Sequence, residues 1–225
     1  MANKPIIVVA GEPYSVFLEI FFKARKNMNY KKPIILIVSK NLLLKQMKKL
    51  NFRFKINLLD KDMSNFSKLD NKKINLIDVS FRFNKTFDKI SNKSNEYISE
   101  CFEIALKLLK KKQFSGLING PISKKHFLDE KFLGITEYLA SKTINNNKFT
   151  MLIFNKKLSV SPMTTHLALK NVSKHIIKQK IYTHVQLITQ FYKKKFKKKP
   201  KIAITGLNPH CESNFKNSEE TETII

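Results

Sequence analysis

The chain has 225 residues, 42% of them hydrophobic, which is enough for a packed core in one large α/β domain or two small lobes. Its 43 basic residues against 17 acidic ones give a formal charge of +26, which would ordinarily indicate a polyanionic partner. Only three of the basic residues are arginines, although bidentate recognition of phosphates and bases favours arginine. Lysine, asparagine, isoleucine and phenylalanine are all frequent while glycine falls to five, a pattern typical of an AT-rich genome rather than of a binding surface.

The cysteine usage and the longest apolar stretches indicate a cytoplasmic protein. Cys101 and Cys211 form neither a disulfide framework nor a CxxC metal motif, which favours reduced thiols. The stretch "VFLEIFF" is interrupted by Glu19 and followed by "KARK", far short of the roughly 20 apolar residues of a membrane span. The amino-terminal "KPIIVVAGEP" is too short for a signal peptide. We therefore expect no membrane partner and no specific nucleic-acid partner.

The first half of the chain alternates β-branched runs with helical periodicity, which predicts βαβ units and a parallel sheet. A long amphipathic helix over 94–113 begins at Ser94, which we interpret as its N-cap. The other elements predicted here are strands over 5–11, 32–39, 53–60 and 72–80 and helices over 15–28 and 41–50.

The second half continues the alternation. Its predicted strands cover 114–121, 149–154, 157–166 and 201–210, and its predicted helices cover 134–143 and 168–195, with a further helix beginning in 217–225. Strands that alternate with helices in this way indicate an α/β fold with a mostly parallel sheet flanked by helices.

Three polar segments fall at predicted strand ends, where ligands gather in such sheets: 119–125 ("NGPISKK"), 163–166 ("MTTH") and 208–210 ("NPH"). A single histidine at a strand end is more often structural than a ligand. Two neutral imidazoles from separate strand ends, His166 and His210, would however form part of a divalent-metal site. The interpretation therefore depends on these two side chains meeting.

The chain offers no obvious third metal ligand. His126, His175 and His184 are expected on the surface, and Cys211 adjoins His210 on an extended segment, where neighbouring side chains point to opposite sides. The general base is not identified, because Lys124 lies in a predicted cleft segment but a solvated lysine is the commoner case. The cofactor-binding residues are not identified either, because no GxGxxG motif is present.

Several segments together resemble, in order and spacing, the PdxA family of 4-hydroxythreonine-4-phosphate dehydrogenases. "GEPYSVFLEI" (11–20) is similar to that family's "GEPAGIGPEI", and "TTHLALKNV" with "GLNPH" is the most specific pair. The matching segments are "GPISK" (120–124), "GITEYLASKT" (134–143), "TTHLALKNV" (164–172) and "ITGLNPHCES" followed by "SEETETII" (204–225).

The resemblance implies a single PdxA-like α/β region over 1–225, with the two-lobed architecture of isocitrate and isopropylmalate dehydrogenases. It also implies a homodimer with its active site at the subunit interface, which uses NAD or NADP and a divalent cation such as zinc, magnesium or cobalt. The implied reaction is oxidation of 4-phosphohydroxy-L-threonine and decarboxylation to 3-amino-2-oxopropyl phosphate, in vitamin B6 biosynthesis. By resemblance, His166 and His210 are two of three histidine ligands of the metal, and Thr136 contacts the substrate.

The chain also departs from the family pattern. Ile135 replaces the histidine of the family's "GHTE", and Ser15 and Phe17 replace glycines of the first motif, so we interpret that motif as a helix start packed with aromatic side chains. The helix beginning at Ser218 is cut after about two turns, so we expect the second lobe to be incomplete at the C-terminus and the third ligand to be missing.

Three functions follow as alternatives. The chain is a 4-hydroxythreonine-4-phosphate dehydrogenase, a sister dehydrogenase of another four-carbon phosphorylated acid of the threonate or erythronate type, or an inactive basic relic that binds polyanions. The substitution at Ile135 motivates the second, and the formal charge motivates the third.

Overall fold

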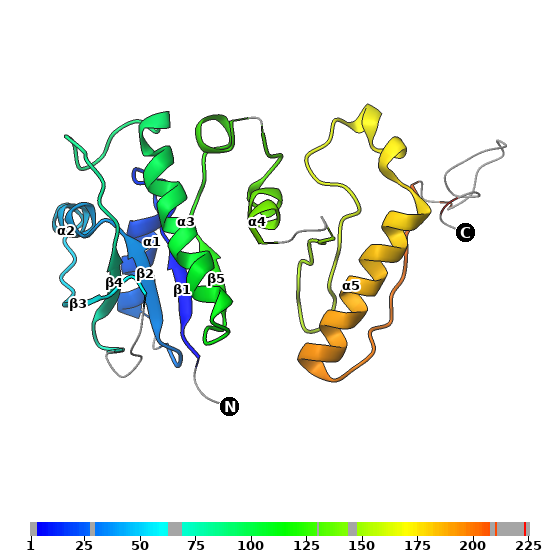
Figure 1. The fold of residues 1–225 in the computed structure, drawn as a ribbon, viewed down its shortest axis with the longest axis horizontal. Coiled ribbons are helices and arrows are strands. Elements are labelled where there is room, and N and C mark those ends of the chain that lie inside the picture. The colour runs from blue at the N-terminus through cyan, green and yellow to red at the C-terminus, as the bar shows by residue number, and fades with distance from the viewer. Residues whose placement is uncertain are drawn as a thin grey trace. The chain divides into compact units, whose positions relative to one another are not determined.

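The computed structural model describes residues 4–27, 30–62, 69–129, 131–143, 148–207, 210 and 223. The chain divides into two compact units, Met1–Lys131 (unit 1) and Phe132–Ile225 (unit 2). Unit 1 contains a five-stranded, fully parallel sheet in the order β3-β4-β2-β1-β5, flanked by helices (Figure 1). The α/β prediction is confirmed, and its strands are β1 (Ile6–Val9), β2 (Ile34–Val38), β3 (Ile56–Leu59), β4 (Ile74–Asp78) and β5 (Gly116–Asn119).

Apolar side chains on both faces of the sheet form the core of unit 1. Successive side chains of a strand point to opposite faces, so the even-numbered residues of β1, β2 and β4 share one face. On that face Val8, Leu36 and Leu76 pack in one cluster with Phe22 and Met47 of the helices α1 and α2. The bounds of these helices are α1 (Phe17–Asn27) and α2 (Lys40–Lys49).

A third helix, α3 (Asn95–Lys110), packs against β1, β2 and β5 and crosses the sheet in Figure 1. Its residues Ile98, Phe102 and Leu108 are completely buried. The odd-numbered strand residues Ile7 and Ile35 are completely buried too. The β-branched runs 5–11 and 32–39 thus contain strands, β1 and β2, that are covered on both faces, as predicted, whereas Leu58 of β3 and Ile118 of β5 at the sheet edges are exposed.

The start of α1 confirms the interpretation of "GEPYSVF" as a helix start packed with aromatics. The backbone N–H of Phe17 donates to Ser15 Oγ at 3.3 Å, and Leu18 is buried. The ring centroid of Phe22 lies 5.4 Å from that of Phe52.

Ser94 stands where the sequence predicts it, directly before α3, but the prediction of a side-chain cap is wrong. Its backbone is helical (φ −90°, ψ −6°), because a short 3-10 turn, η2 (Asn92–Ser94), leads into the helix. Its hydroxyl lies 3.1 Å from Glu12 Oε2 and 2.9 Å from the carbonyl oxygen of Ser91, so it is used across the fold rather than along the helix.

The carboxyl ends of β1 and β5 meet at the point where the strand order reverses, the usual ligand position in open α/β sheets. Here Glu12, 2% exposed, accepts from the Ser94 hydroxyl with Oε2 and from the Ser123 N–H with Oε1 at 3.3 Å. Its own N–H donates to the carbonyl oxygen of Pro121 at 2.9 Å. Burial raises the pKa of this carboxyl, although the two hydrogen bonds and the nearby His126 oppose the shift.

The backbones of these two turns also approach each other closely. Gly11 has φ +77°, and a Cβ at this position would lie 2.4 Å from the carbonyl oxygen of Pro121. A Cβ at Gly120 would lie 2.0 Å from the carbonyl oxygen of Ala10. Neither position therefore has room for a side chain.

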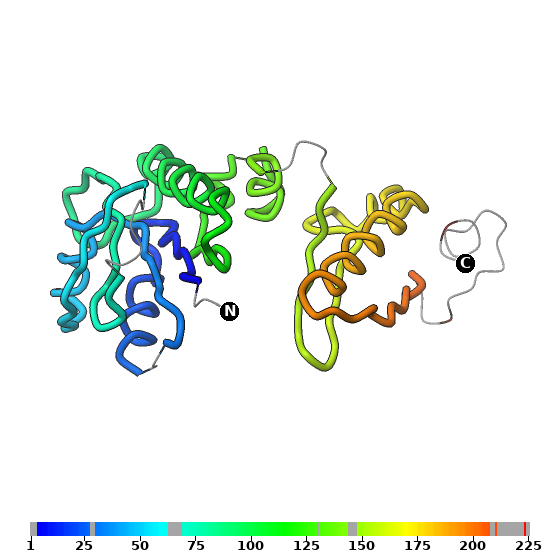
Figure 2. Tube along the Cα trace, turned by 60° about the horizontal axis from the view of Figure 1, so that its bottom comes forward, coloured from blue at the N-terminus to red at the C-terminus, as the bar shows by residue number. Residues whose placement is uncertain are grey.

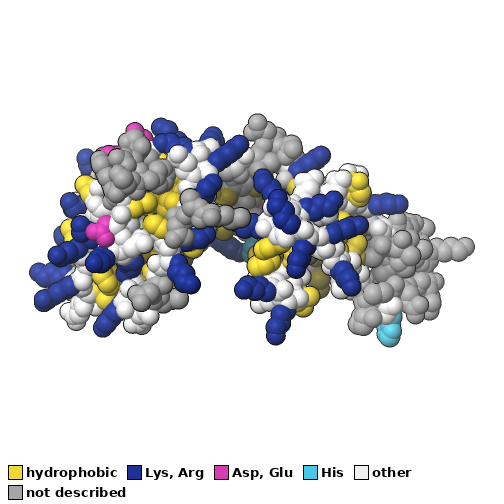
Figure 3. Space-filling view, turned by 90° about the horizontal axis from the view of Figure 1, so that it is seen from below, with side chains coloured by type: hydrophobic (Ala, Val, Ile, Leu, Met, Phe, Trp, Pro, Cys, Tyr) yellow, Lys and Arg dark blue, Asp and Glu magenta, His cyan; other side chains and the backbone are white. Residues whose placement is uncertain are grey.

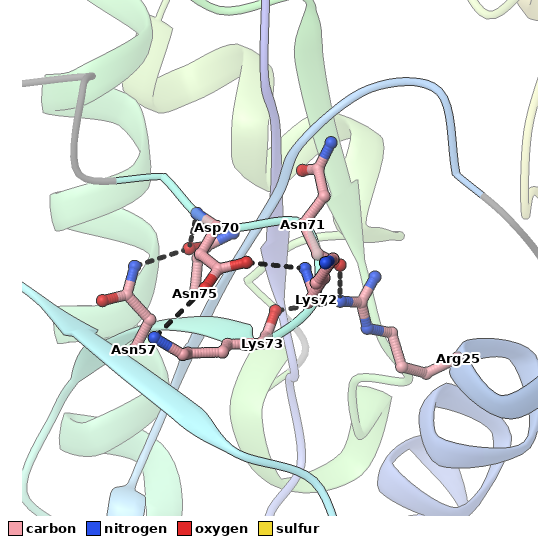
Figure 4. A network of polar contacts seen from close by, with 7 residues as sticks. All are labelled: Arg25, Asn57, Asp70, Asn71, Lys72, Lys73 and Asn75. Atoms are coloured by element: carbon pink, nitrogen blue, oxygen red, sulfur yellow. Dashed lines mark hydrogen bonds and ion pairs between the residues drawn. The ribbon is translucent and has the colours of Figure 1, made fainter.

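The opposite edge of the sheet is closed by a polar network (Figure 4). Asn75 of β4 accepts from the N–H of Asp70 at 2.9 Å and from Asn57 Nδ2 at 2.8 Å, and donates to the carbonyl oxygen of Ile34 at 3.2 Å. Arg25 of α1 donates to the carbonyl oxygens of Asn71 and Lys73. In the same network the backbone N–H of Lys72 donates to Asp70 Oδ1, and Lys73 forms an ion pair with Asp70 at 3.1 Å.

Unit 2 is built around α5 (Lys178–Phe196), beside which the preceding extended segments run in both views (Figures 1 and 2). Its other elements are α4 (Ile135–Thr143), η4 (Leu169–Asn171) and η5 (Ser173–His175), and η3 (Lys124–Leu128) is a helical turn of unit 1. The predicted helix over 134–143 is thus confirmed.

Four predictions for unit 2 are wrong. Segments 149–154 and 157–166 form no strands and are joined by one antiparallel bridge between Ile153 and Val160, and 201–207, within the predicted strand 201–210, forms no strand either. The predicted helix over 168–195 is two short 3-10 turns followed by α5, because the β-branched Ile176 and Ile177 adopt extended backbones and Ile176 is buried. The helix predicted in 217–225 lies outside the described residues, apart from Thr223.

The described helices include none that is both long enough and apolar enough to cross a membrane.

Replacing Asn75 tests the polar network. Asn75→Val leaves the Asp70 N–H and Asn57 Nδ2 without their acceptor, so we expect the free energy of unfolding to fall by about 2 kcal/mol. Urea unfolding followed by circular dichroism measures it. Asn71→Ala is the matched control, because Asn71 gives the network only its backbone carbonyl (Figure 4); an equal loss in both variants would contradict the assignment.

Replacing Glu12 tests the raised pKa at the carboxyl edge. A carboxyl whose pKa is raised by folding stabilises the fold fully below its unfolded pKa, near 4.5, and that contribution is lost as the pH rises through the folded pKa. Relative to Glu12→Gln, the wild-type chain should therefore lose stability as the pH rises above about 4.5. Unfolding free energies of both proteins between pH 4 and 8 check this, with the exposed Glu103→Gln as control. A constant difference across that range would contradict the shift.

Candidate functional site

Two of the predicted site segments meet at a cavity inside unit 2. The cavity has a volume of about 460 Å³ and includes Thr136 of α4 and the segment 162–165 that leads to His166. The basic and hydroxyl side chains that line it are Lys148, Lys180, His175, His184, Thr136, Thr150, Thr164, Thr165 and Thr183. Beside the Glu137 carboxylate and the apolar residues that also line the cavity, these side chains offer hydrogen-bond donors and positive charge to an anionic ligand.

The first turn of α4 contacts the "TTH" segment directly. Glu137, next to Thr136, accepts a hydrogen bond from Thr165 Oγ1 with its Oε1 at 2.8 Å. Its Oε2 is buried and has no hydrogen-bond partner within the described residues. The neighbouring Gly134 is buried, and a Cβ there would lie 3.0 Å from Glu137 Oε2 and 3.3 Å from His166 Nε2.

His166 has an unusual backbone conformation, with φ +55°. The other four described non-glycine residues with positive φ each follow the end of a helical segment, where a left-handed residue is common: Asn51, Lys112, Asp129 and Lys197. His166 lies instead at an exposed bend before η4. Left-handed non-glycine residues away from helix ends are sparse, and they cluster at functional sites.

His210 is an exposed turn residue of unit 2. Its neighbours 208, 209 and 211 lie outside the described residues, so the structure does not test Cys211 as a co-ligand. Within the described parts of the chain, no group of three or more histidine, cysteine or acidic side chains is placed to hold a metal ion. The pairing of His166 with His210 therefore stays a prediction.

The remaining histidines divide between the two units. His126 is a partly buried residue of unit 1, with Nδ1 2.7 Å from Asn92 Oδ1. His175 is exposed, as expected, and its ring contacts the carbonyl oxygen of Asn171 at 2.8 Å. His184 was expected on the surface but is buried in α5, so that expectation is wrong. The spacing of His184 from the buried Ile181, three residues earlier on one helix face, is the signal that could have shown it.

The hydrogen bonds around His184 indicate which of its two ring nitrogens carries the proton. Ser161 Oγ donates to the carbonyl oxygen of Met151 at 2.7 Å, so the Thr150 hydroxyl donates to Ser161 Oγ at 3.1 Å. Thr150 Oγ1 can then only accept from His184 Nδ1, at 3.0 Å. This direction leaves the other ring nitrogen, Nε2, as a hydrogen-bond acceptor. Burial, together with Lys180, lowers the pKa of His184, so the ring is neutral near pH 7.

Lysine and arginine side chains are spread over the visible face rather than gathered into one patch (Figure 3). The densest lysine run, 193–199, is exposed and comprises the last turn of α5 and the residues that follow it. A polyanion-binding surface would concentrate these charges on one face or along one helix.

The assignment of His184 predicts an NMR signature. We expect the Nδ1–H tautomer and a pKa below the ordinary value of 6.5. Thr150→Val removes the acceptor of that proton and should shift the tautomer equilibrium, which long-range ¹H–¹⁵N spectra of the imidazole report. Thr183→Val removes a hydroxyl that bonds the Gln179 carbonyl and should leave the ring unchanged. An Nε2–H tautomer in the wild-type chain would contradict the hydrogen-bond direction.

Comparisons with known proteins identify the family of the chain. Residues 29–225 match the family described as "Pyridoxal phosphate biosynthetic protein PdxA". A relative from Sulfurihydrogenibium sp. (strain YO3AOP1), named 4-hydroxythreonine-4-phosphate dehydrogenase, is 33% identical over 98% of the chain and 68% of its own length. A relative from Oceanobacillus iheyensis, whose name proposes a D-threonate 4-phosphate dehydrogenase, is 27% identical over the whole chain and 70% of its own length.

Solved structures of proteins with the same name share the fold of this chain. The crystal structure of 4-hydroxythreonine-4-phosphate dehydrogenase from Klebsiella pneumoniae matches 98% of the chain and 69% of its own chain, with a TM-score of 0.81 at 22% identity. The chain thus spans about two thirds of the length of these proteins. The matched family, the sequence identity and the shared fold together show that this chain belongs to the PdxA family of oxidoreductases.

Proposed function

We propose that the chain is a 4-hydroxythreonine-4-phosphate dehydrogenase of pyridoxal 5'-phosphate biosynthesis. It oxidises the secondary hydroxyl of 4-phosphohydroxy-L-threonine with NAD or NADP, and the product loses carbon dioxide to give 3-amino-2-oxopropyl phosphate. The observation that supports this most directly is the meeting of Thr136 with Thr164 and Thr165, the residues directly before His166, at one cavity of unit 2. The name of the Sulfurihydrogenibium relative supports the reaction.

The cavity suits a ligand with anionic groups. A phosphorylated amino acid carries a phosphate and a carboxylate, which lysine ammonium groups and hydroxyl donors bind well. Lys148 and Lys180 supply the charge, and Thr136 supplies a hydroxyl for the substrate contact. The neutral His184 adds a ring nitrogen that accepts hydrogen bonds.

A divalent cation fits the residues around His166. The imidazole and Glu137 Oε2, which has no hydrogen-bond partner among the described residues, both lie within 3.3 Å of one point, the position of a Cβ on Gly134. A carboxylate beside a histidine suits a site in which imidazole nitrogens bind zinc, cobalt or another divalent ion. When bound, the cation would polarise the substrate hydroxyl and stabilise charge during decarboxylation. His166 and His210 would hold it.

A sister activity on D-threonate 4-phosphate or a related acid is the second candidate. Ile135 begins α4 directly before Thr136, at the position of the family's histidine, and an alkyl group donates no hydrogen bond to a substrate. The name of the Oceanobacillus relative supports this alternative.

The active enzyme is proposed to be a cytoplasmic homodimer with its active site at the subunit interface. Large apolar side chains of unit 2 support an interface, because Leu158 is 73% exposed and Leu169 87% exposed. Exposed apolar residues of this size commonly mark protein contacts when they gather together.

Turnover and metal binding test the proposal together. With 4-phosphohydroxy-L-threonine, NAD and zinc, magnesium or cobalt, NADH absorbance should rise, and kcat/KM for D-threonate 4-phosphate should be lower. His166→Ala should weaken Co²⁺ affinity more than about tenfold in calorimetry, since a direct ligand is lost.

His175→Ala is the matched control, because His175 is an exposed histidine at the same cavity and is not a predicted ligand. Equal Co²⁺ affinity in the wild-type and His166→Ala chains would contradict the metal role. Salt-dependent binding of DNA without turnover of either acid would instead support the polyanion-binding alternative.

A further inference from the structure

We propose that Glu137 is a positioning residue that holds His166, through Thr165, in the geometry in which it binds the cation. The inference deepens the proposed function and rests on the metal role of His166. Glu137 directly follows Thr136, but its proposed role is to position His166, whereas Thr136 is proposed to contact the substrate.

The link between Glu137 and His166 is short and specific. Glu137 Oε1 accepts from the hydroxyl of Thr165, the residue directly before His166, at 2.8 Å. Hydrogen bonds to a carboxylate are among the stronger ones in proteins. The bond joins the first turn of α4 to an extended segment that is 28 residues away in the chain.

The backbone of His166 needs such support. A left-handed backbone at a residue other than glycine is strained, and it persists only where the surroundings fix it. His166 has φ +55° without following a helix. Because Thr165 is the adjacent residue, its hydrogen bond restricts the torsions that set the direction of the imidazole.

The second oxygen of Glu137 indicates that the side chain is not placed for stability alone. Oε2 is buried without a hydrogen-bond partner in the described part of the chain, and such an atom costs free energy. An apolar side chain would avoid that cost but could not accept from Thr165. The carboxylate is therefore retained for a contact that only an acceptor provides.

Gly134 keeps the imidazole next to this carboxylate. A Cβ at Gly134 would approach Glu137 Oε2 to 3.0 Å and the His166 ring to 3.3 Å, closer than ordinary van der Waals contact. Because Gly134 has no side chain, the start of α4 can approach both the Glu137 carboxylate and the edge of the His166 ring. The three groups thus form one unit around His166.

Co²⁺ binding to the full 225-residue chain tests the proposal, with affinity from calorimetry and ligand geometry from the visible absorption spectrum. Glu137→Ala and Thr165→Val should each weaken Co²⁺ binding about tenfold and alter the spectrum, because His166 is no longer held. The double variant should be no weaker than either single one, because both changes break the same link. Glu137→Gln should bind within about threefold of wild type, since its amide oxygen still accepts from Thr165.

Two variants serve as controls. Thr143→Val removes a hydroxyl of the same helix that bonds only the Leu139 carbonyl, and Glu103→Ala removes an exposed carboxylate of unit 1; neither should change Co²⁺ binding. Thermal unfolding of every variant separates loss of fold from loss of positioning. If Glu137→Ala does not fold, the other two variants still test the proposal, because Thr165→Val should weaken Co²⁺ binding whereas Glu137→Gln should retain it.

The outcomes distinguish this proposal from the proposed function. If His166→Ala leaves Co²⁺ affinity unchanged, the metal role of His166 fails and the positioning role fails with it. If His166→Ala weakens binding but Thr165→Val does not, or if the effects of Glu137→Ala and Thr165→Val add, the positioning role alone is overturned.

Discussion

Burial of both faces of a parallel sheet determines where unit 1 can place polar groups. With Val8 and Leu36 packed on one face and Ile7 and Ile35 buried on the other, hydrogen-bonding side chains are mostly confined to the strand ends. The two ends are used differently. The amino edge carries a network around Asn75 that closes a turn, and the carboxyl edge carries a buried carboxyl between two turns that meet where the strand order reverses.

Unit 2 follows another principle, because its described residues bury few large apolar side chains. Its segments are tied instead by polar contacts that cross between elements. One is the series of hydroxyls from Ser161 through Thr150 to His184, and the other is the bond between Thr165 and Glu137. Directional contacts of this kind set the orientation of a ring more narrowly than apolar packing does. They lie beside the same cavity, which is why unit 2 is the better candidate for the chemistry.

Much of unit 1 could be predicted from the sequence, because β-branched runs buried on both faces produce an unmistakable apolar pattern. All five of its strands and the helices α1 to α3 lie where that pattern predicts them. The family resemblance was also readable, since the "TTH" and "NPH" segments combine rare residues at fixed spacing. Thr136, Thr164 and Thr165 line one cavity, while the roles of Thr136, His166 and His210 stay predictions.

The errors have physical causes. Segments 149–154 and 157–166 have the apolarity of strands, but a strand also needs partners, which composition does not report. The helix over 168–195 is interrupted because burial of Ile176 favours an extended backbone over the local helical period. Ser94 and His184 were misjudged because their partners, Glu12 and Thr150, are distant in the chain. The positive φ of His166 has no sequence signal at all.

The close approach of the two turns in unit 1 also bears on which substitutions the chain can accept. Only five of the 225 residues are glycines. At Gly11, Gly120 and Gly134 even a single methyl group would collide with or crowd a neighbour. These three glycines therefore mark positions at which the polypeptide tolerates no added bulk.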